Sequence, residues 1–99
     1  MDGLDIRVEE HERRLVLRLR GTLDGRTAHA VTRALASLPA LPLTVDFSGV
    51  RTFVDLSVDA LTRALRDRPV SLTGLGRHQA RMFRYFGLRV EEREQPVEA

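Results

Sequence analysis

An alternation of apolar and polar residues over 14–20, interrupted only at Val16, places the strongest constraint on the fold. Leucine occupies its three odd positions, and arginine occupies three of its four even positions. Successive side chains of a strand point to opposite faces of a sheet, so this pattern predicts a strand with one buried and one solvated face. Strands that are covered on both faces are apolar throughout instead. We therefore expect a sheet with one open face, and we predict that Gly21 ends this strand.

Four other segments are expected to be strands. Residues 43–47 and 70–73 also alternate between apolar and polar side chains. The shorter segments 6–8 and 88–90 have the same pattern and predict two short strands. Residues 48–52 contain Ser, Gly and Thr, and we interpret them as a turn.

Three segments show the spacing of an amphipathic helix. Apolar residues recur every three or four positions in 27–38, 56–66 and 77–86, which places them on one helical face. Thr27 and Asp55 stand where the first two helices begin. We predict that both are N-caps, because Thr and Asp side chains accept hydrogen bonds from free backbone N–H groups.

The order of these elements predicts the class of fold. Strands that alternate with helices are typical of α/β domains with βαβ connections. Because the strands alternate in polarity, we expect helices on one face of the sheet and solvent on the other. The 99 residues suffice for one domain. We predict a two-layer α/β domain over 1–99, with its core at about 5–91 and a flexible tail at 92–99.

Several classes of function lack the residues that they require. The chain has no Cys, which excludes disulfides, thiolate metal sites and cysteine nucleophiles. Its three His residues fall on separate predicted elements without metal-ligand spacing. No nucleophile elbow or phosphate-binding Gly-rich loop is present. We therefore predict a protein that is not an enzyme and that needs neither a metal nor a cofactor.

Hydropathy and charge constrain the location and the partners of the chain. No apolar run reaches the roughly 18 residues of a membrane span, and residues 1–5 do not resemble a signal peptide, so we expect a cytoplasmic protein without membrane insertion. All 16 basic residues are Arg, and the net charge is +2. The basic residues lie between acidic ends, which a solvated surface explains. With one Tyr, four Phe and no Trp, few side chains could stack on bases, and we expect no nucleic-acid partner.

The third predicted helix is the most basic one. Arg77, Arg81 and Arg84 fall on one helical face. Such a stripe could meet anionic lipid or an acidic partner, but a solvated face is the simpler interpretation. Phe83 and Phe86 are expected to lie in the core.

Three short motifs stand at the ends of predicted strands. Residues 21–24 read Gly-Thr-Leu-Asp, and residues 45–50 with 53–55 read Val-Asp-Phe-Ser-Gly-Val and Phe-Val-Asp. Residues 72–75 and 86–88 read Leu-Thr-Gly-Leu and Phe-Gly-Leu. In this order, the motifs resemble the signatures of STAS domains, the anti-sigma-factor antagonists of bacteria, over nearly the whole chain. The resemblance implies a mixed sheet with helices packed mainly on one face, and a role in the regulation of transcription.

The central motif departs from the family at its phosphoacceptor. Where STAS domains carry Asp-Ser-Ser-Gly, this chain has Asp55, Leu56, Ser57 and Val58. The resemblance implies that partner kinases phosphorylate the first Ser of that motif, and Leu56 takes its place. Leu has no hydroxyl, so the usual phosphorylation switch cannot operate there. Ser57 could be a substitute phosphoacceptor, but we favour a structural role, since its hydroxyl points in a different direction.

The resemblance also implies a partner-binding surface at the start of the second helix and at the turn beside it. A simpler role is open to its acids: Asp55 as an N-cap, Asp24 as a turn residue and Asp59 as an acid in a first helical turn. The sequence leaves it open whether Leu56 is exposed or buried. The predicted surface comprises Asp24, Gly25, Asp55, Leu56, Ser57 and Asp59.

The resemblance implies a protein partner, an anti-sigma factor or a related kinase-fold regulator. Binding would then be constitutive or regulated by other means than phosphorylation. The alternative is an accessory subunit that docks onto the ATPase subunit of an ABC-type lipid transport system, where STAS-like proteins do not require the serine. A scaffold of several STAS copies and a homodimer also stay open.

Overall fold

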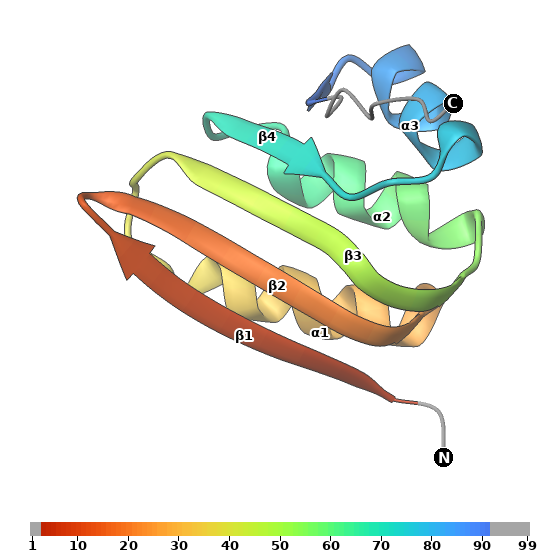
Figure 1. Ribbon diagram of the computed structural model, residues 1–99, viewed down its shortest axis with the longest axis horizontal. Helices are drawn as coiled ribbons and strands as arrows, with labels where there is room; N and C mark the ends of the chain where they lie inside the picture. The colour runs from red at the N-terminus through yellow and green to blue at the C-terminus, as the bar shows by residue number, and fades with distance from the viewer. Residues whose placement is uncertain (1–2, 92–99) are drawn as a thin grey trace, which may run out of the picture.

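The computed structural model describes residues 3–91, and these form five strands and three helices (Figure 1). No helix of this range is long and apolar enough to cross a membrane. The tail predicted at 92–99 lies outside the described residues. The elements are β1 (Leu4–His11), β2 (Arg14–Leu23), α1 (Gly25–Ala36), β3 (Leu43–Phe53), α2 (Leu56–Leu65), β4 (Val70–Thr73), α3 (Arg77–Tyr85) and β5 (Arg89–Val90).

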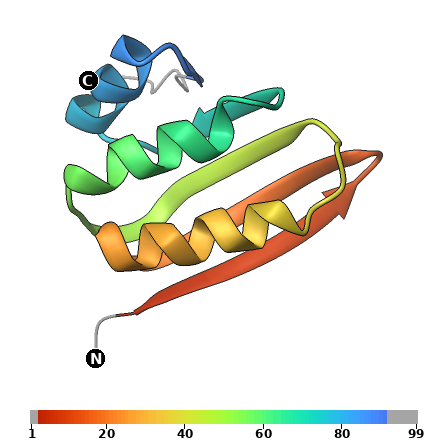
Figure 2. The ribbon, with the colours of Figure 1, turned by 180° about the vertical axis from the view of Figure 1, so that it is seen from behind.

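The strands form one sheet in the order β1-β2-β3-β4-β5. β1 is antiparallel to β2, and all later neighbours are parallel. Helices α1 and α2 lie side by side across one face of the sheet (Figure 2), while α3 lies beside the edge formed by β4 and β5. The predicted two-layer α/β domain, with a mixed sheet and helices mainly on one face, is therefore confirmed.

The register of the sheet is the one that the alternation in β2 predicts. Leu17 and Leu19 are at most 2% exposed, whereas Arg18 and Arg20 lie on the open face. Burying one such leucine contributes roughly 1.5–3 kcal/mol to folding. The buried core between the sheet and the helices is completed by Leu15, Leu23, Ala28, Val31, Leu35, Leu43, Val45, Phe47, Val58, Leu61, Leu65, Leu72, Phe83 and Leu88.

The two central strands are longer than predicted. β2 continues past Gly21 to Leu23, and β3 runs through 48–52, which the sequence analysis interpreted as a turn. The register between β2 and β3 shifts twice near Gly21. Gly21 has a φ of +114°, and a side chain there would strike the carbonyl of Gly3. This glycine therefore marks an irregularity within the strand rather than its end, because only Gly adopts such a backbone so close to a neighbour.

Strand β1 is also longer than the predicted segment 6–8, because it pairs along the length of β2 from Leu4 to His11. Glu12 and Arg13 connect the two strands, with φ values of +48° and +67°. A two-residue hairpin loop of the I′ class requires positive φ at both central residues. The connection therefore holds β1 in register without a glycine.

The end of α3 places a different residue in the core from the one predicted. Gly87, at a φ of +90°, turns the chain back so that the Leu88 N–H donates to the Phe83 carbonyl over 3.0 Å. This is the Schellman arrangement, in which the residue after the glycine packs onto the last turn. Leu88 is accordingly 9% exposed, whereas Phe86 is 36% exposed. The prediction that Phe86 lies in the core is wrong, and the prediction for Phe83 is confirmed.

Candidate functional site

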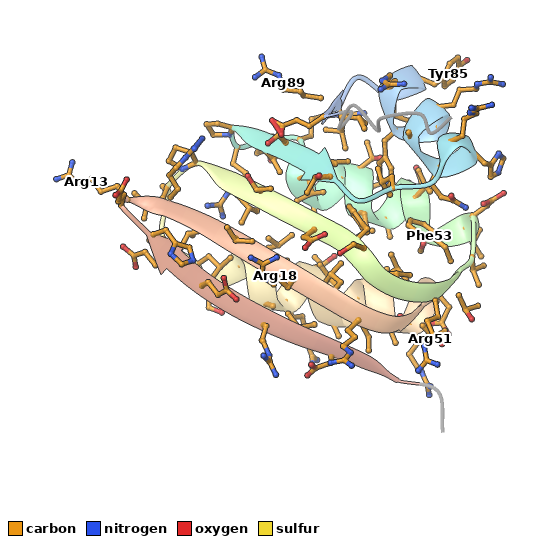
Figure 3. The ribbon with its side chains drawn as sticks, viewed as in Figure 1. Arg13, Arg18, Arg51, Phe53, Tyr85 and Arg89 are labelled. Carbon is orange, nitrogen blue, oxygen red and sulfur yellow. The ribbon has the colours of Figure 1, made fainter. Side chains whose placement is uncertain are left out.

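The predicted site residues lie at the ends of two neighbouring parallel strands. Leu23 of β2 pairs with Phe53 of β3, and the next N–H, that of Val54, donates to the Leu23 carbonyl over 2.8 Å. Asp24 follows β2 directly, Asp55 follows β3 after Val54, and each directly precedes a helix, α1 or α2. The starts of both helices are therefore held together at one end of the sheet, near Arg51 and Phe53 in Figure 3.

Asp24 is the N-cap of α1, a role that the sequence analysis gave to Thr27. Its carboxylate accepts hydrogen bonds from the backbone N–H groups of Arg26 and Thr27, over 3.1 and 2.9 Å. In return, the Asp24 N–H donates to the Thr27 hydroxyl oxygen over 2.8 Å. This reciprocal capping box satisfies three backbone N–H groups at the helix start. The backbone N–H of Thr27 also holds the pKa of Asp24 below its ordinary value.

Asp55 does not cap α2, and that prediction is wrong. Its own backbone is already helical, at φ −54° and ψ −32°, and its side chain makes no capping hydrogen bond. An N-cap needs an extended backbone for its side chain to reach back to the helix. The Asp55 carboxylate instead meets Nε2 of His78, in α3, at 2.9 Å. Both side chains are more than half exposed, so this contact joins α2 to α3 at the surface.

Leu56 and Ser57 are adjacent in the chain but have opposite surroundings. Leu56 is 74% exposed, and Val54, two residues earlier, is 40% exposed. Ser57 is fully buried, and its hydroxyl donates to the Val54 carbonyl over 2.7 Å. The first turn of α2 therefore offers an apolar side chain to solvent and turns its hydroxyl inward. This settles the open question about Leu56, which is not a core residue.

The remaining predicted residues flank this apolar centre. Gly25 is exposed at the first position of α1, and a side chain there would meet no neighbour within 4 Å. Asp59 is exposed on the first turn of α2 and pairs with Arg63 one turn later, at 3.1 Å. Both residues leave the exposed side chain of Leu56 accessible. Ser57, which the sequence analysis included in the partner-binding surface, is fully buried and leaves that surface, while the exposed Val54 joins it. We call the group Asp24, Gly25, Val54, Asp55, Leu56 and Asp59 the docking surface.

A second polar feature, on the open face of the sheet, was not anticipated from the sequence. Arg18 donates to Glu9 of β1 over 3.0 Å and to Asp46 of β3 over 2.7 Å, and Figure 3 shows it over the middle of the sheet. Arg18, and then His11, lower the pKa of Glu9. Burial raises the pKa of Asp46, but hydrogen bonds from Ser48 and Arg18 outweigh it and leave the pKa below its ordinary value. Only the strand order brings these three residues together.

The same face carries a cavity of about 670 Å³ between the sheet and α3. Arg18, Asp46, Thr73 and Arg77 contribute polar groups to its lining. The basic stripe predicted on α3 is exposed at all three of its arginines. The cavity includes none of the residues of the docking surface.

Comparisons with solved structures show the same fold. An anti-sigma factor antagonist from Mycobacterium paratuberculosis matches with a TM-score of 0.70 at 22% identity, over 89% of this chain and 86% of that one. The anti-sigma factor antagonist SpoIIAA in its unphosphorylated form matches with a TM-score of 0.69 at 16% identity, over 91% and 90%. A variant of RsbS from Moorella thermoacetica matches with a TM-score of 0.63 at 15% identity, over 90% and 87%.

A search among curated proteins finds no match. A family model does match: the one described as "Mlab, STAS domain" aligns with residues 6–90. This range includes all six residues of the docking surface. It also includes the whole sheet except Leu4 and Asp5 at the start of β1. The chain belongs to the STAS domain family.

Proposed function

We propose that this STAS domain is a non-enzymatic protein–protein interaction module, an antagonist-like regulator whose partner contacts the docking surface without a phosphorylation switch. The observation that carries the proposal is the exposure of Leu56, 74% of whose surface faces solvent at the start of α2. A partner that covers an exposed apolar side chain gains the free energy of removing it from water. Side chains that carry a large share of binding energy sit at the centre of such desolvated contacts.

The immediate surroundings of Leu56 support this proposal. Val54 adds a second exposed apolar side chain, and Asp24 and Asp55 place carboxylates at the starts of the two neighbouring helices. An apolar centre within a polar rim is the usual composition of a protein interface. The carboxylates favour a partner that presents basic groups, since complementary charge speeds association and excludes wrong partners.

Constitutive binding follows from the two residues at the phosphoacceptor position. Leu56 has no hydroxyl, and the hydroxyl of Ser57 is fully buried and donates to the Val54 carbonyl. A kinase would have to unfold the first turn of α2 to reach Ser57. Incubation with a kinase-fold anti-sigma partner and ATP should therefore leave Ser57 unmodified by phosphopeptide mass spectrometry. Stoichiometric phosphate on Ser57 would contradict constitutive binding.

Affinity capture from the native cell tests the proposal. The tagged chain and its Leu56→Asp variant serve as matched baits, because the substitution replaces an exposed apolar side chain by a charged one. We expect a protein with a histidine-kinase-like ATPase domain to be retained by the natural chain and lost by the variant. If both baits retain the same proteins in the same amounts, Leu56 is not part of the contact.

The second candidate is an accessory subunit of an ABC-type lipid transport system. The missing hydroxyl at position 56 favours it, because this docking mode does not require the serine of the family motif. The same capture experiment distinguishes the two candidates. A transporter ATPase that depends on Leu56 would support this second candidate and would contradict the first.

A further inference from the structure

The strand β1 forms a long edge of the sheet, and its outer side is free to pair. β1 is the outermost strand, and within residues 3–91 its eight residues pair with no strand on the side away from β2 (Figure 1). The opposite edge, β5, has only two residues. Val8, in the middle of β1, is 45% exposed. An exposed edge of this length can hydrogen-bond a further strand unless its side chains oppose that pairing.

The backbone of β1 shows which of its groups face the free edge. The Thr22 N–H donates to the Gly3 carbonyl over 3.0 Å, and β1 pairs with β2 without a register shift. Because N–H and C=O groups alternate sides along a strand, odd-numbered residues of β1 bond to β2. The N–H and C=O groups of Leu4, Ile6, Val8 and Glu10 therefore point outward and are available to a second strand.

The side chains on the open face of β1 are complementary to those of a second, antiparallel copy of β1. Asp5, Arg7, Glu9 and His11 share this face, in that order. When a second β1 is laid antiparallel with Val8 opposite Val8, Arg7 stands opposite Glu9 of the second copy. Asp5 then stands opposite His11 of the second copy, and the symmetry repeats both pairs. In such an arrangement these are the non-hydrogen-bonded positions, where opposing side chains lie closest.

Other registers are less complementary over the length of the strand. The outward N–H and C=O groups belong to even-numbered residues, so even-numbered residues must face even-numbered ones of the second copy. Each possible register therefore has one residue at its centre that stands opposite itself. A centre on Arg7 puts Arg7 opposite itself and Asp5 opposite Glu9, and a centre on Glu9 puts Glu9 opposite itself. Both place like charges in direct opposition, which destabilises a strand pair. A centre on Ile6 pairs Asp5 with Arg7 but leaves Glu9 opposite Gly3, and it shortens the overlap of the two strands. A centre on Glu10 puts Glu10 opposite itself and shortens the overlap further.

We propose that a second copy of this chain pairs with the β1 edge, antiparallel and with Val8 opposite Val8, to form a symmetric dimer with a continuous sheet. Each copy presents the same strand to the other, as an interface with two-fold symmetry requires. Among residues 3–91, Asp5 and Arg7 have no ion-pair partner within the chain. In the dimer, Arg7 gains Glu9 of the second copy as an ion-pair partner, and Asp5 faces the imidazole of His11. The proposal does not depend on the proposed partner, because β1 contains no residue of the docking surface.

The mass of the full chain in solution, measured by sedimentation equilibrium over a concentration series, tests this dimer. We expect a reversible dimer for the natural chain. Val8→Pro should weaken it about tenfold or more, since it removes the outward N–H of Val8 in both copies. The monomer should tolerate the proline, because that N–H makes no bond to β2 and proline is accepted on edge strands. A chain that is monomeric at every concentration would overturn the proposal.

Charge reversal tests the register itself. Arg7→Glu puts Glu opposite Glu9 of the second copy and should weaken the dimer about tenfold or more. The double variant Arg7→Glu with Glu9→Arg restores opposite charges and should restore the dimer, although it loses the Glu9–Arg18 hydrogen bond. Arg81→Glu makes the same change of charge on α3, at the other edge, and should leave the dimer unchanged. A dimer that is equally stable in all of these variants would place the interface elsewhere and overturn the proposal.

Discussion

The starts of α1 and α2 lie side by side at one end of the sheet, and their polar groups are used in different ways. At α1, the Asp24 carboxylate accepts two backbone N–H groups and the Thr27 hydroxyl oxygen accepts a third. At α2, the Asp55 carboxylate bonds no backbone group of its own helix. The side chain that follows it, Leu56, is the exposed one. The polar side chains at the start of α1 bond to the backbone of α1, whereas the side chains of Asp55 and Leu56 at the start of α2 face outward.

The local sequences explain this difference. Asp24 is followed three residues later by Thr27, which is the spacing of a reciprocal capping box with Thr in place of the usual Glu or Gln. Asp55 is followed at that distance by Val58, which is buried in the core. Its side chain has no hydrogen-bonding group that could complete a capping box. One start therefore contributes to stability, and the other is free to take part in recognition. The following predictions test this separation.

The largest effect is expected from a charge at Ser57. Ser57→Asp places a carboxylate at a fully buried position beside the Val54 carbonyl, which we expect to lower the free energy of unfolding by about 3 kcal/mol. Ser57→Ala removes only the hydrogen bond and should cost about 1 kcal/mol. Urea unfolding of both variants measures the difference. Equal stability of Ser57→Asp and the natural chain would mean that Ser57 faces solvent.

The next effect compares the two aspartates directly. Asp24→Ala should lower the melting temperature by several degrees, because it removes the acceptor of two helix N–H groups. Asp55→Ala loses only an exposed contact with His78 and should leave the melting temperature almost unchanged. Thermal melts monitored by circular dichroism measure both. A reversed order would mean that the capping roles are assigned the wrong way round.

The smallest effect concerns pH. The pKa of Asp24 in the folded chain is lowered, first by the Thr27 N–H, from an ordinary value of 3.8. The stability that this carboxylate adds is therefore fully present above pH 3.8 and is lost as the pH falls through the lower pKa of the folded state. Asp24→Asn keeps an acceptor for the cap but does not titrate. The natural chain should lose stability relative to Asp24→Asn on acidification, as melting temperatures against pH would measure.

A constant difference between the natural chain and Asp24→Asn over this range of pH would contradict the lowered pKa. Glu9 and Asp46 also have lowered pKa values. The stability that these two carboxylates add is therefore also lost as the pH falls. Because both proteins retain these two residues, the comparison isolates Asp24.

The sequence predicts the faces of the strands better than their ends. Leucine at every second position of β2 fixes which side of the sheet is buried, since no other register covers those side chains. The ends are set by pairing instead. Residues 48–52 have turn-like composition, yet they stay extended because they pair with the end of β2. Glycine is typical of a strand end, but Gly21 lies at an irregularity within β2.

The candidate site could be predicted by place but not by role. The motifs locate both helix starts, and the parallel strands bring them together as the resemblance implies. The role of each aspartate depends on backbone torsion angles that a residue name does not specify, so the sequence assigned the cap of α1 to Thr27 and a cap to Asp55. Leu56 lies outside the apolar stripe of Val58, Leu61 and Leu65, and this spacing is consistent with its exposure.

The most direct test of the central claim is a calorimetric titration of the captured partner with the Leu56→Asp variant, beside a thermal melt of the same protein. Because Leu56 is exposed, the variant should change the free energy of unfolding by no more than about 0.5 kcal/mol. It should weaken partner binding by about 2 kcal/mol or more, since a charge would replace a desolvated apolar contact. Tyr85→Asp removes an 85% exposed side chain on α3 and should bind normally. Early melting of Leu56→Asp with normal binding once folded would contradict the docking surface.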